Sequence, residues 1–224
     1  MSVEIRSWHS GAEGSASVPT PPRGKSLSFV SHHMTFSVRP ALPEDAEAAC
    51  NAVRTSIEEC CAADHEGEKA RLDAWLKNKS PENFCAWIQS ESLYCVVVEE
   101  CSRIVGFGMS APGEVLLCYV FPEVRFRGAG KAMLQAIELW AATSGVPELK
   151  LESTRTALAF YRRNGFKISG PAITFAGMEG QPMSKQVMAN LSIERTGESE
   201  LASHVKCYAS PEKRDPISAD AESS

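Results

Sequence analysis

Apolar and polar residues alternate with two different periods in the middle of the chain, and the period distinguishes helical segments from strands. Spacings of three and four residues between apolar positions predict amphipathic helices. The expected helices cover residues 43–60, 72–76, 80–88, 132–140 and 157–164. Ser80 and Pro81 provide a helix start, and Gly165 provides a helix stop. The apolar residues of the 132–140 helix, Leu139 among them, are expected to face mostly inward.

β-Branched and aromatic residues dominate the other patterned segments, which favours strands. The expected strands cover residues 36–38, 93–99, 104–109, 115–121, 149–151, 166–173 and 184–188. A polar turn at residues 100–103 separates two of them, so we expect a hairpin there. Strands mixed with helices in this order predict an α/β (α+β) fold in which helices cover both faces of a mixed sheet.

The two ends of the chain lack this patterning. Residues 1–33 are rich in Ser, Pro and Gly, and we expect a disordered extension without a signal peptide there. Residues 189–224 carry seven acidic side chains against four basic ones, which predicts an acidic, disordered tail. The expected domain is therefore residues 34–188, which is long enough to bury a core of its own.

Composition narrows the class of protein. A formal net charge of -5 disfavours general binding to nucleic acid, and no apolar run is long enough to span a membrane. The eight cysteines contain no C-x-x-C pair, which disfavours a structural metal site and a disulfide framework. We therefore expect a cytoplasmic protein with no metal, no nucleic-acid partner and no membrane partner.

The segment Arg125–Lys131, with the sequence RFRGAGK, lies between an expected strand and the long expected helix. Glycines at a helix start let an anion approach backbone amides, while Arg and Lys add positive charge. Ala132 rules out a P-loop, and Met133 rules out a dinucleotide-binding fingerprint. The segment does meet the pattern [RQ]-x-x-G-x-[GA]. Taken alone, this motif indicates either a phosphate-binding loop or an ordinary loop before a helix.

Other stretches of the sequence, before and after this segment, support its assignment as a phosphate-binding loop. VLLCYVFPEVRFRGAG covers residues 115–130 and FYRRNGF covers residues 160–166. With FSVRPALPEDA at residues 36–46 and SRIVGFG at residues 102–108, they resemble the GNAT superfamily of N-acetyltransferases over roughly residues 36–188. The resemblance implies a mostly antiparallel central sheet with a splayed centre. It also implies that the protein transfers acetyl from acetyl-CoA to a primary amine, which attacks the thioester directly. Homodimers are frequent in this family, so the resemblance is compatible with a homodimer.

The resemblance further implies a cofactor site. The pyrophosphate of acetyl-CoA is expected on the loop residues Arg125, Phe126, Arg127, Gly128, Ala129, Gly130 and Lys131. The pantetheine is expected to lie like an added strand beside Cys118, Tyr119 and Val120. Backbone amides near Tyr119 and Val120 would then polarise the thioester carbonyl.

Tyr161 falls on the tyrosine that protonates the leaving thiolate in this family, so the resemblance assigns it as the catalytic acid. Packing of its short helix against the sheet is the alternative role. Many family members carry an Asn seven or five residues before the tyrosine, where this chain has Thr154 and Thr156. A threonine hydroxyl lacks the paired donor and acceptor of an amide, so pantetheine binding is expected to be weaker or to rely on the backbone.

The amine acceptor needs a base, because an alkylamine is mostly protonated at pH 7. Candidates by location are Glu58, Glu59, His65 and Glu114, and a water relay serves equally well. Cys95 and Cys118 are rejected as nucleophiles because no His is placed to activate them.

The identity of the acceptor stays open at this point. A free-standing, acidic domain favours a small-molecule amine. The alternatives are a protein or peptide acceptor, and a domain that binds CoA as a sensor or scaffold without turnover.

Overall fold

The structure, a computed structural model, describes residues 27–29 and 36–187. The tail expected at residues 189–224 lies outside these ranges, as does the extension expected at residues 1–33 apart from a short strand, β1 (Leu27–Phe29). The remaining described residues, 36–187, lie within the range expected for the domain.

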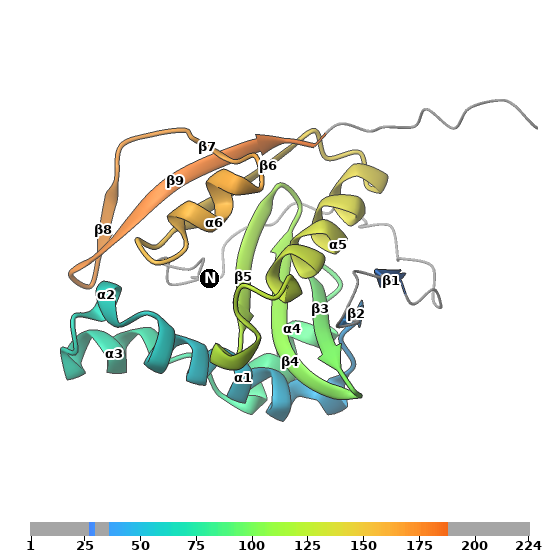
Figure 1. The fold of residues 1–224 in the computed structure, drawn as a ribbon, viewed down its shortest axis with the longest axis horizontal. Coiled ribbons are helices and arrows are strands. Elements are labelled where there is room, and N and C mark those ends of the chain that lie inside the picture. Colours follow the sequence, from blue (N-terminus) through green and yellow to red (C-terminus); the bar gives the residue numbers. More distant parts are fainter. Residues whose placement is uncertain (1–26, 30–35, 188–224) are drawn as a thin grey trace, which may run out of the picture. The chain divides into compact units, whose positions relative to one another are not determined.

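Within the described residues, nine strands form a sheet in the order β1-β2-β3-β4-β5-β6-β9-β7, with β8 pairing β9 (Figure 1). The strands after β1 are β2 (Phe36–Pro40), β3 (Tyr94–Glu100), β4 (Arg103–Ala111), β5 (Glu114–Val120), β6 (Glu148–Ser153), β7 (Lys167–Ile168), β8 (Ile173–Phe175) and β9 (Met178–Gln186). Neighbouring strands of these ranges are antiparallel except β5 and β6. The predicted mixed, mostly antiparallel sheet is confirmed.

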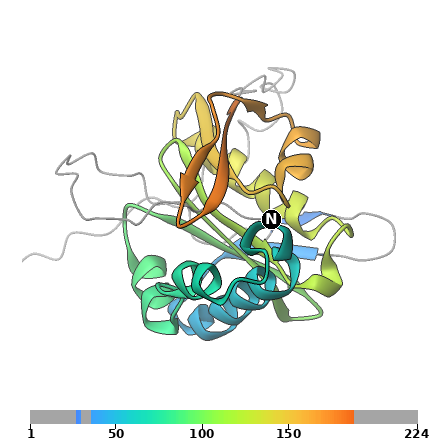
Figure 2. The same cartoon turned by 90° about the vertical axis from the view of Figure 1, so that its left-hand side faces the viewer.

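Helices cover both faces of the sheet. They are α1 (Ala46–Cys60), α2 (Ala62–His65), α3 (Lys69–Leu76), α4 (Pro81–Gln89), α5 (Ala129–Thr143) and α6 (Leu158–Arg163). Side chains of β3 alternate between two cores, because Val96 packs in the core that contains α5 and Val97 in the core that contains α1 and α4. Figure 2 shows α1–α4, coloured blue to green, together on one side of the sheet. The predicted coverage of both faces is confirmed.

Two glycines let β4 pack closely at the centre of the sheet. A Cβ atom at Gly106 would lie 2.6 Å from the backbone oxygen of Tyr119, and one at Gly108 would lie 2.9 Å from Cγ of Met133. Because real Cβ atoms do not approach so closely, both positions require glycine for β4 to reach β5 and α5.

The structure agrees with the sequence on the position of one turn and one helix start. Cys101 (φ 51°) and Ser102 (φ 62°) form the turn of the β3–β4 hairpin, with the two positive φ values of a type I′ turn. The Ser80 hydroxyl accepts a hydrogen bond from Asn83 N–H at 3.4 Å at the start of α4. The hairpin and this helix cap are therefore confirmed.

Other boundaries differ from the prediction. The strand expected at residues 166–173 is instead two short strands, β7 and β8, because Gly170 and Pro171 interrupt it. The strand expected to begin at Ser184 begins at Met178, where pairing with β6 and β8 supports a polar sequence. Leu139 is 48% exposed, because it lies on the outer side of α5. The short helix α2 was not predicted.

Candidate active site

The centre of the sheet opens between β5 and β6. These parallel strands pair at one position, Glu114 opposite Lys150, next to a hydrogen bond of 2.8 Å from Lys150 N–H to the Gly113 oxygen. β5 then continues to Val120 and β6 to Ser153 with no further pairing between them in the described residues. The two strands therefore diverge, and the predicted splayed centre of the sheet is confirmed.

The alternation of β5 decides which backbone amides face this opening. Phe121 N–H donates to the Val105 oxygen at 2.8 Å, and the Tyr119 oxygen lies close to Gly106, so both residues turn toward β4. Cys118 and Val120, at the alternate positions, therefore turn their N–H groups toward the gap. Two donors along one strand edge suit an extended ligand that binds like an added strand.

The segment predicted to bind phosphate lies between β5 and α5. A 3-10 turn, Pro122–Val124, leads into it, and Gly128 (φ 102°) is the residue before the helix. The first amides of an α-helix have no carbonyl partner in a preceding turn, and the helix dipole makes this end positive. The segment therefore presents backbone donors at the start of a 15-residue helix, as an anion site requires.

The two arginines of this segment differ in their contacts. The Arg127 guanidinium donates to the Glu100 carboxylate and to the Glu123 carbonyl oxygen (3.2 Å), and it lies over the Phe36 ring. Arg127 thus anchors the loop to the rest of the domain. Arg125 differs, because its buried Nε has no hydrogen-bond partner among the described residues.

Tyr161 lies on α6 and is completely buried, packed edge-on against Phe160 and Phe166. Its buried hydroxyl lies against the Cys118 thiol, which is a weak hydrogen-bond partner. Burial raises the pKa of Tyr161 well above its usual value, and the nearby Cys118 and Tyr119 add to this shift. Because sulfur is a weak hydrogen-bonding atom, an oxygen or nitrogen of a ligand at hydrogen-bond distance would be a stronger partner for this hydroxyl.

The thiols of Cys118, on β5, and of Cys95, on β3, are poor nucleophiles. Burial raises the pKa of Cys118 to about 11 and the pKa of Cys95 to about 12. Both side chains are therefore protonated at neutral pH, whereas thiolate is the reactive form. These values agree with the rejection of both residues as nucleophiles.

The turn between β6 and α6 is held by Asp64, a buried residue of α2 that the sequence analysis missed. The Asp64 carboxylate accepts hydrogen bonds from Arg155 N–H (2.8 Å) and from the Thr156 hydroxyl (2.5 Å). The Thr154 hydroxyl accepts a hydrogen bond from Ala157 N–H at 3.3 Å. Both threonines thus shape the turn that precedes Tyr161.

The four candidate bases lie in different surroundings. Glu58 is exposed and pairs with Arg54, and Glu59 is also exposed. His65 is buried, and its Nδ1 accepts a hydrogen bond from Gly67 N–H at 3.1 Å. In the neutral ring the proton then resides on Nε2, so that atom cannot accept a second one. Glu114 lines a cavity beside the position where β5 pairs with β6.

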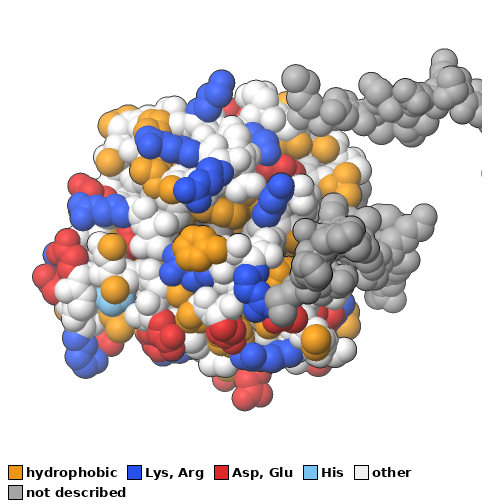
Figure 3. All heavy atoms as spheres, viewed as in Figure 1, with side chains coloured by type: hydrophobic (Ala, Val, Ile, Leu, Met, Phe, Trp, Pro, Cys, Tyr) orange, Lys and Arg blue, Asp and Glu red, His pale blue; other side chains and the backbone are white. Residues whose placement is uncertain are grey.

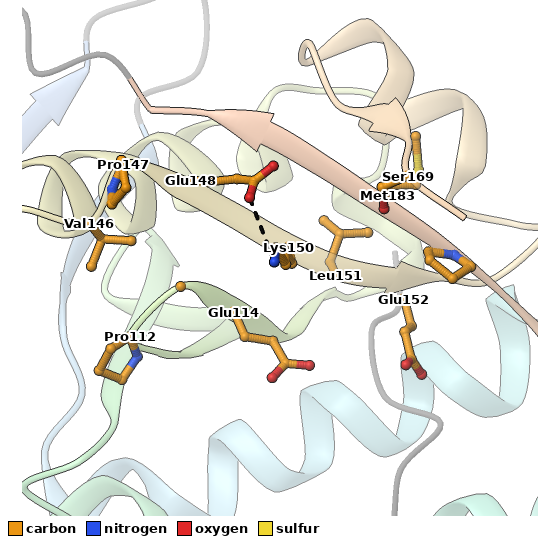
Figure 4. A pocket seen from close by; sticks show the side chains of 12 residues that line it. Pro112, Glu114, Val146, Pro147, Glu148, Lys150, Leu151, Glu152, Ser169 and Met183 are labelled. Carbon is orange, nitrogen blue, oxygen red and sulfur yellow. Dashed lines mark ion pairs between the residues drawn. The ribbon is translucent and has the colours of Figure 1, made fainter. Parts of the chain in front are cut away.

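This cavity, of about 610 Å³, lies where β5 and β6 meet (Figure 4). Three glutamates line it, with one lysine: Glu114, Glu148, Glu152 and Lys150. Lys150 pairs with Glu148 at 3.7 Å, whereas the carboxylates of Glu114 and Glu152 point to the same side of the two strands. The cavity is therefore acidic, with apolar walls that include Val146.

Charge is unevenly distributed over the face drawn in Figure 3. Lys and Arg side chains gather in its upper part, over α6 and α5, and Asp and Glu lie along its lower edge. The exposed cations of these two helices are Lys131, Arg162 and Arg163. This distribution favours a polyanion near the start of α5.

Residues 27–29 and 36–187 contain no group of three His, Cys, Asp or Glu side chains suited to a metal ion. No helix in these ranges has the length and apolar character needed to cross a bilayer.

Comparison with known proteins identifies the family. Residues 61–187 match the model of the acetyltransferase (GNAT) domain, which is more than half of the chain. The chain belongs to the GNAT acetyltransferase family, and the predicted resemblance is confirmed. A comparison with curated proteins gives no match.

Solved structures share the fold. A GCN5-related N-acetyltransferase from Rhodopseudomonas palustris is 23% identical, with a TM-score of 0.60 over 73% of this chain and 99% of that one. The PaiA N-acetyltransferase from Thermoplasma acidophilum, in complex with coenzyme A, is 24% identical, with a TM-score of 0.58 over 68% and 99%. The ribosomal-protein-S18-alanine N-acetyltransferase from Escherichia coli is 19% identical, with a TM-score of 0.50 over 70% and 98%.

We expect Asp64→Ala to lower the free energy of unfolding by about 2 kcal/mol, because it leaves Arg155 N–H and the Thr156 hydroxyl without their acceptor. Urea denaturation measures this change. Asp73→Ala is the control, since Asp73 pairs with Lys69 on the exposed side of α3 and should change stability by less than about 0.5 kcal/mol. Equal effects of the two variants would contradict this role for Asp64.

Proposed function

We propose that the protein is an N-acetyltransferase that moves acetyl from acetyl-CoA to a primary amine of a small molecule by direct attack. The observation that carries this proposal is the opening between β5 and β6, with the Cys118 and Val120 amides on its edge. The anion loop leads from the end of β5 into α5, and the buried Tyr161 hydroxyl is an electrostatic neighbour of Cys118.

Several features fit acetyl-CoA, which supplies an activated acetyl thioester when it is bound. Arg125, Lys131 and the amides of residues 128–130 would hold the pyrophosphate, with Arg127 as the anchor of the loop. The buried Arg125 Nε, which has no hydrogen-bond partner in the described chain, is a polar atom that such a ligand would satisfy. Thr154 and Thr156 would act through the backbone of the turn that they shape.

The chemical roles follow from the surroundings of each group. The N–H groups of Cys118 and Val120 would donate to the thioester carbonyl and stabilise the charge that develops on its oxygen. Tyr161, kept protonated by burial, would donate its proton to the leaving sulfur. Glu114 would accept the proton of the amine through a chain of water molecules, because it lies four residues before Cys118 on β5, about 13 Å along the strand. The protonated thiols of Cys95 and Cys118 favour a route without an acyl-enzyme.

The cavity supports a small, positively charged acceptor. Its volume of about 610 Å³ is typical of pockets that enclose small molecules. The carboxylates of Glu114 and Glu152 would attract an ammonium group, and the apolar walls would cover a carbon chain. A protein acceptor and binding without turnover are the alternatives that the experiments below separate.

Replacing Gly128 by Glu should weaken CoA binding at least tenfold, about 1.4 kcal/mol, because a carboxylate would occupy the anion site. Isothermal titration with CoA measures the affinity. Gly145→Glu is the matched control, because Gly145 also has a positive φ (73°) and nothing within 4 Å of its Cβ position, yet it lies at the other end of α5. CoA binding that survives in Gly128→Glu would refute the loop assignment.

Tyr161→Phe should lower kcat roughly 100-fold, because it removes the hydroxyl that would donate the proton and keeps the ring that packs against Phe160 and Phe166. Steady-state kinetics with released thiol as the readout measures kcat, with Tyr94→Phe, on β3, as the control. An unchanged kcat would exclude Tyr161 as the acid. If the wild-type protein binds acetyl-CoA but acetylates no amine or peptide, the result would favour the alternative that the domain binds CoA without turnover.

Glu152→Gln should raise KM about tenfold for amines that carry a second positive charge, because the cavity loses one negative charge. Lys150→Gln should change KM in the opposite direction, since it removes the only cation of the described cavity lining. KM values for a panel of monoamines and polyamines check both changes. Identical KM values in the two variants would place the acceptor elsewhere.

A further inference from the structure

Phe126 is exposed in a way that packing does not explain. Its side chain is 86% exposed, whereas the other large apolar side chains exposed in the described ranges reach at most 49%. Its φ of 61° lies in the left-handed region, which is unusual for a bulky residue. Phe126 thus has both a solvent-exposed aromatic ring and a strained backbone conformation. Strain of this kind is concentrated at functional sites.

The structure holds Phe126 firmly in this conformation. On one side, Arg125 N–H donates to the Pro122 oxygen at 3.2 Å. On the other side, Arg127 is tied to the Glu100 carboxylate and the Glu123 carbonyl oxygen. The Arg125 guanidinium lies 4.9 Å from the centre of the Phe126 ring. The ring is therefore presented by a rigid frame, directly beside the amides that begin α5.

We propose that Phe126 is a stacking platform for the adenine of acetyl-CoA. This inference rests on the proposed function, because it takes the anion loop as the pyrophosphate site. In CoA a ribose alone separates the adenine from the pyrophosphate, so an aromatic ring next to the loop lies within reach of the base. Aromatic rings bind nucleobases by stacking without regard to base identity, and a guanidinium beside the ring adds to this attraction.

A second copy of the chain is the competing occupant of the ring. A single exposed ring offers far less apolar area than a stable dimer interface needs. The ring also lies beside the Arg125 guanidinium, and the exposed Lys131 follows in the first turn of α5, so the surroundings favour a phosphorylated ligand over an apolar protein surface.

The test compares three ligands by isothermal titration: CoA, dephospho-CoA and 4′-phosphopantetheine. Phe126→Ala should weaken CoA and dephospho-CoA about tenfold, because both contain adenine. It should leave 4′-phosphopantetheine, which lacks adenine, unchanged. Phe126→Trp should retain the affinity for all three ligands, since it keeps an aromatic platform.

A second variant separates binding from folding. Phe126→Gly should raise the melting temperature of the ligand-free protein, because glycine adopts a positive φ without strain, and it should still weaken CoA binding. Ala176→Gly is the matched control, because Ala176 has a φ of 49° and lies in the turn between β8 and β9. It should raise the melting temperature and leave CoA affinity unchanged.

Three results would overturn the inference. One is an equal loss of affinity for 4′-phosphopantetheine, and another is no loss for CoA. The third is conversion of a dimer to a monomer by Phe126→Ala with CoA binding intact, which would assign the ring to an interface between copies. Failure of the wild-type protein to bind any of the three ligands would instead refute the proposed function itself.

Discussion

The structure depends on the fact that β5 and β6 pair at only one position. Backbone N–H and C=O groups need partners, and two adjacent strands normally supply them to each other along their length. Here the pairing stops after Glu114 and Lys150, and β5 and β6 separate. Strands β1–β4 extend the sheet from β5, and β9, β7 and β8 extend it from β6. The resulting gap is an internal sheet edge, which an extended ligand could complete.

Some residues around this gap hold the surrounding elements in place, and others have polar atoms available to a ligand. Gly106 brings β4 against β5, and Arg127 holds the loop before α5 in place. Arg125 and Tyr161 differ from these residues, because the buried Arg125 Nε has no partner in the described chain and the Tyr161 hydroxyl lies against the Cys118 thiol. Buried polar atoms are almost always hydrogen-bonded in folded proteins, so an Arg125 Nε without a partner in the loop that follows β5 fits a binding site there.

The sequence predicted the features that are encoded locally. The segment at residues 125–131 and the FYRRNGF stretch are contiguous, so the fold class, the splay and the family followed from them. The first part of β9, residues 178–183, gave no such signal, because its strand conformation comes from pairing with β6 and β8. The different contacts of Arg125 and Arg127 could not be predicted from the sequence either, because both residues are simply cations in the same loop motif. Side-chain partners from distant segments decide these cases.

The Asp64 contact has a consequence for the order in which the domain becomes ordered. Its two hydrogen bonds span 91 and 92 residues of sequence, so they close one of the longest loops in the chain. Closing a long loop has a high entropic penalty, which favourable contacts recover only after both ends have packed. The turn before Tyr161 should therefore form late in folding and open early under mild stress, while the two cores remain intact. Under mild denaturing stress the domain would then lose the correct placement of Tyr161 before it loses its fold.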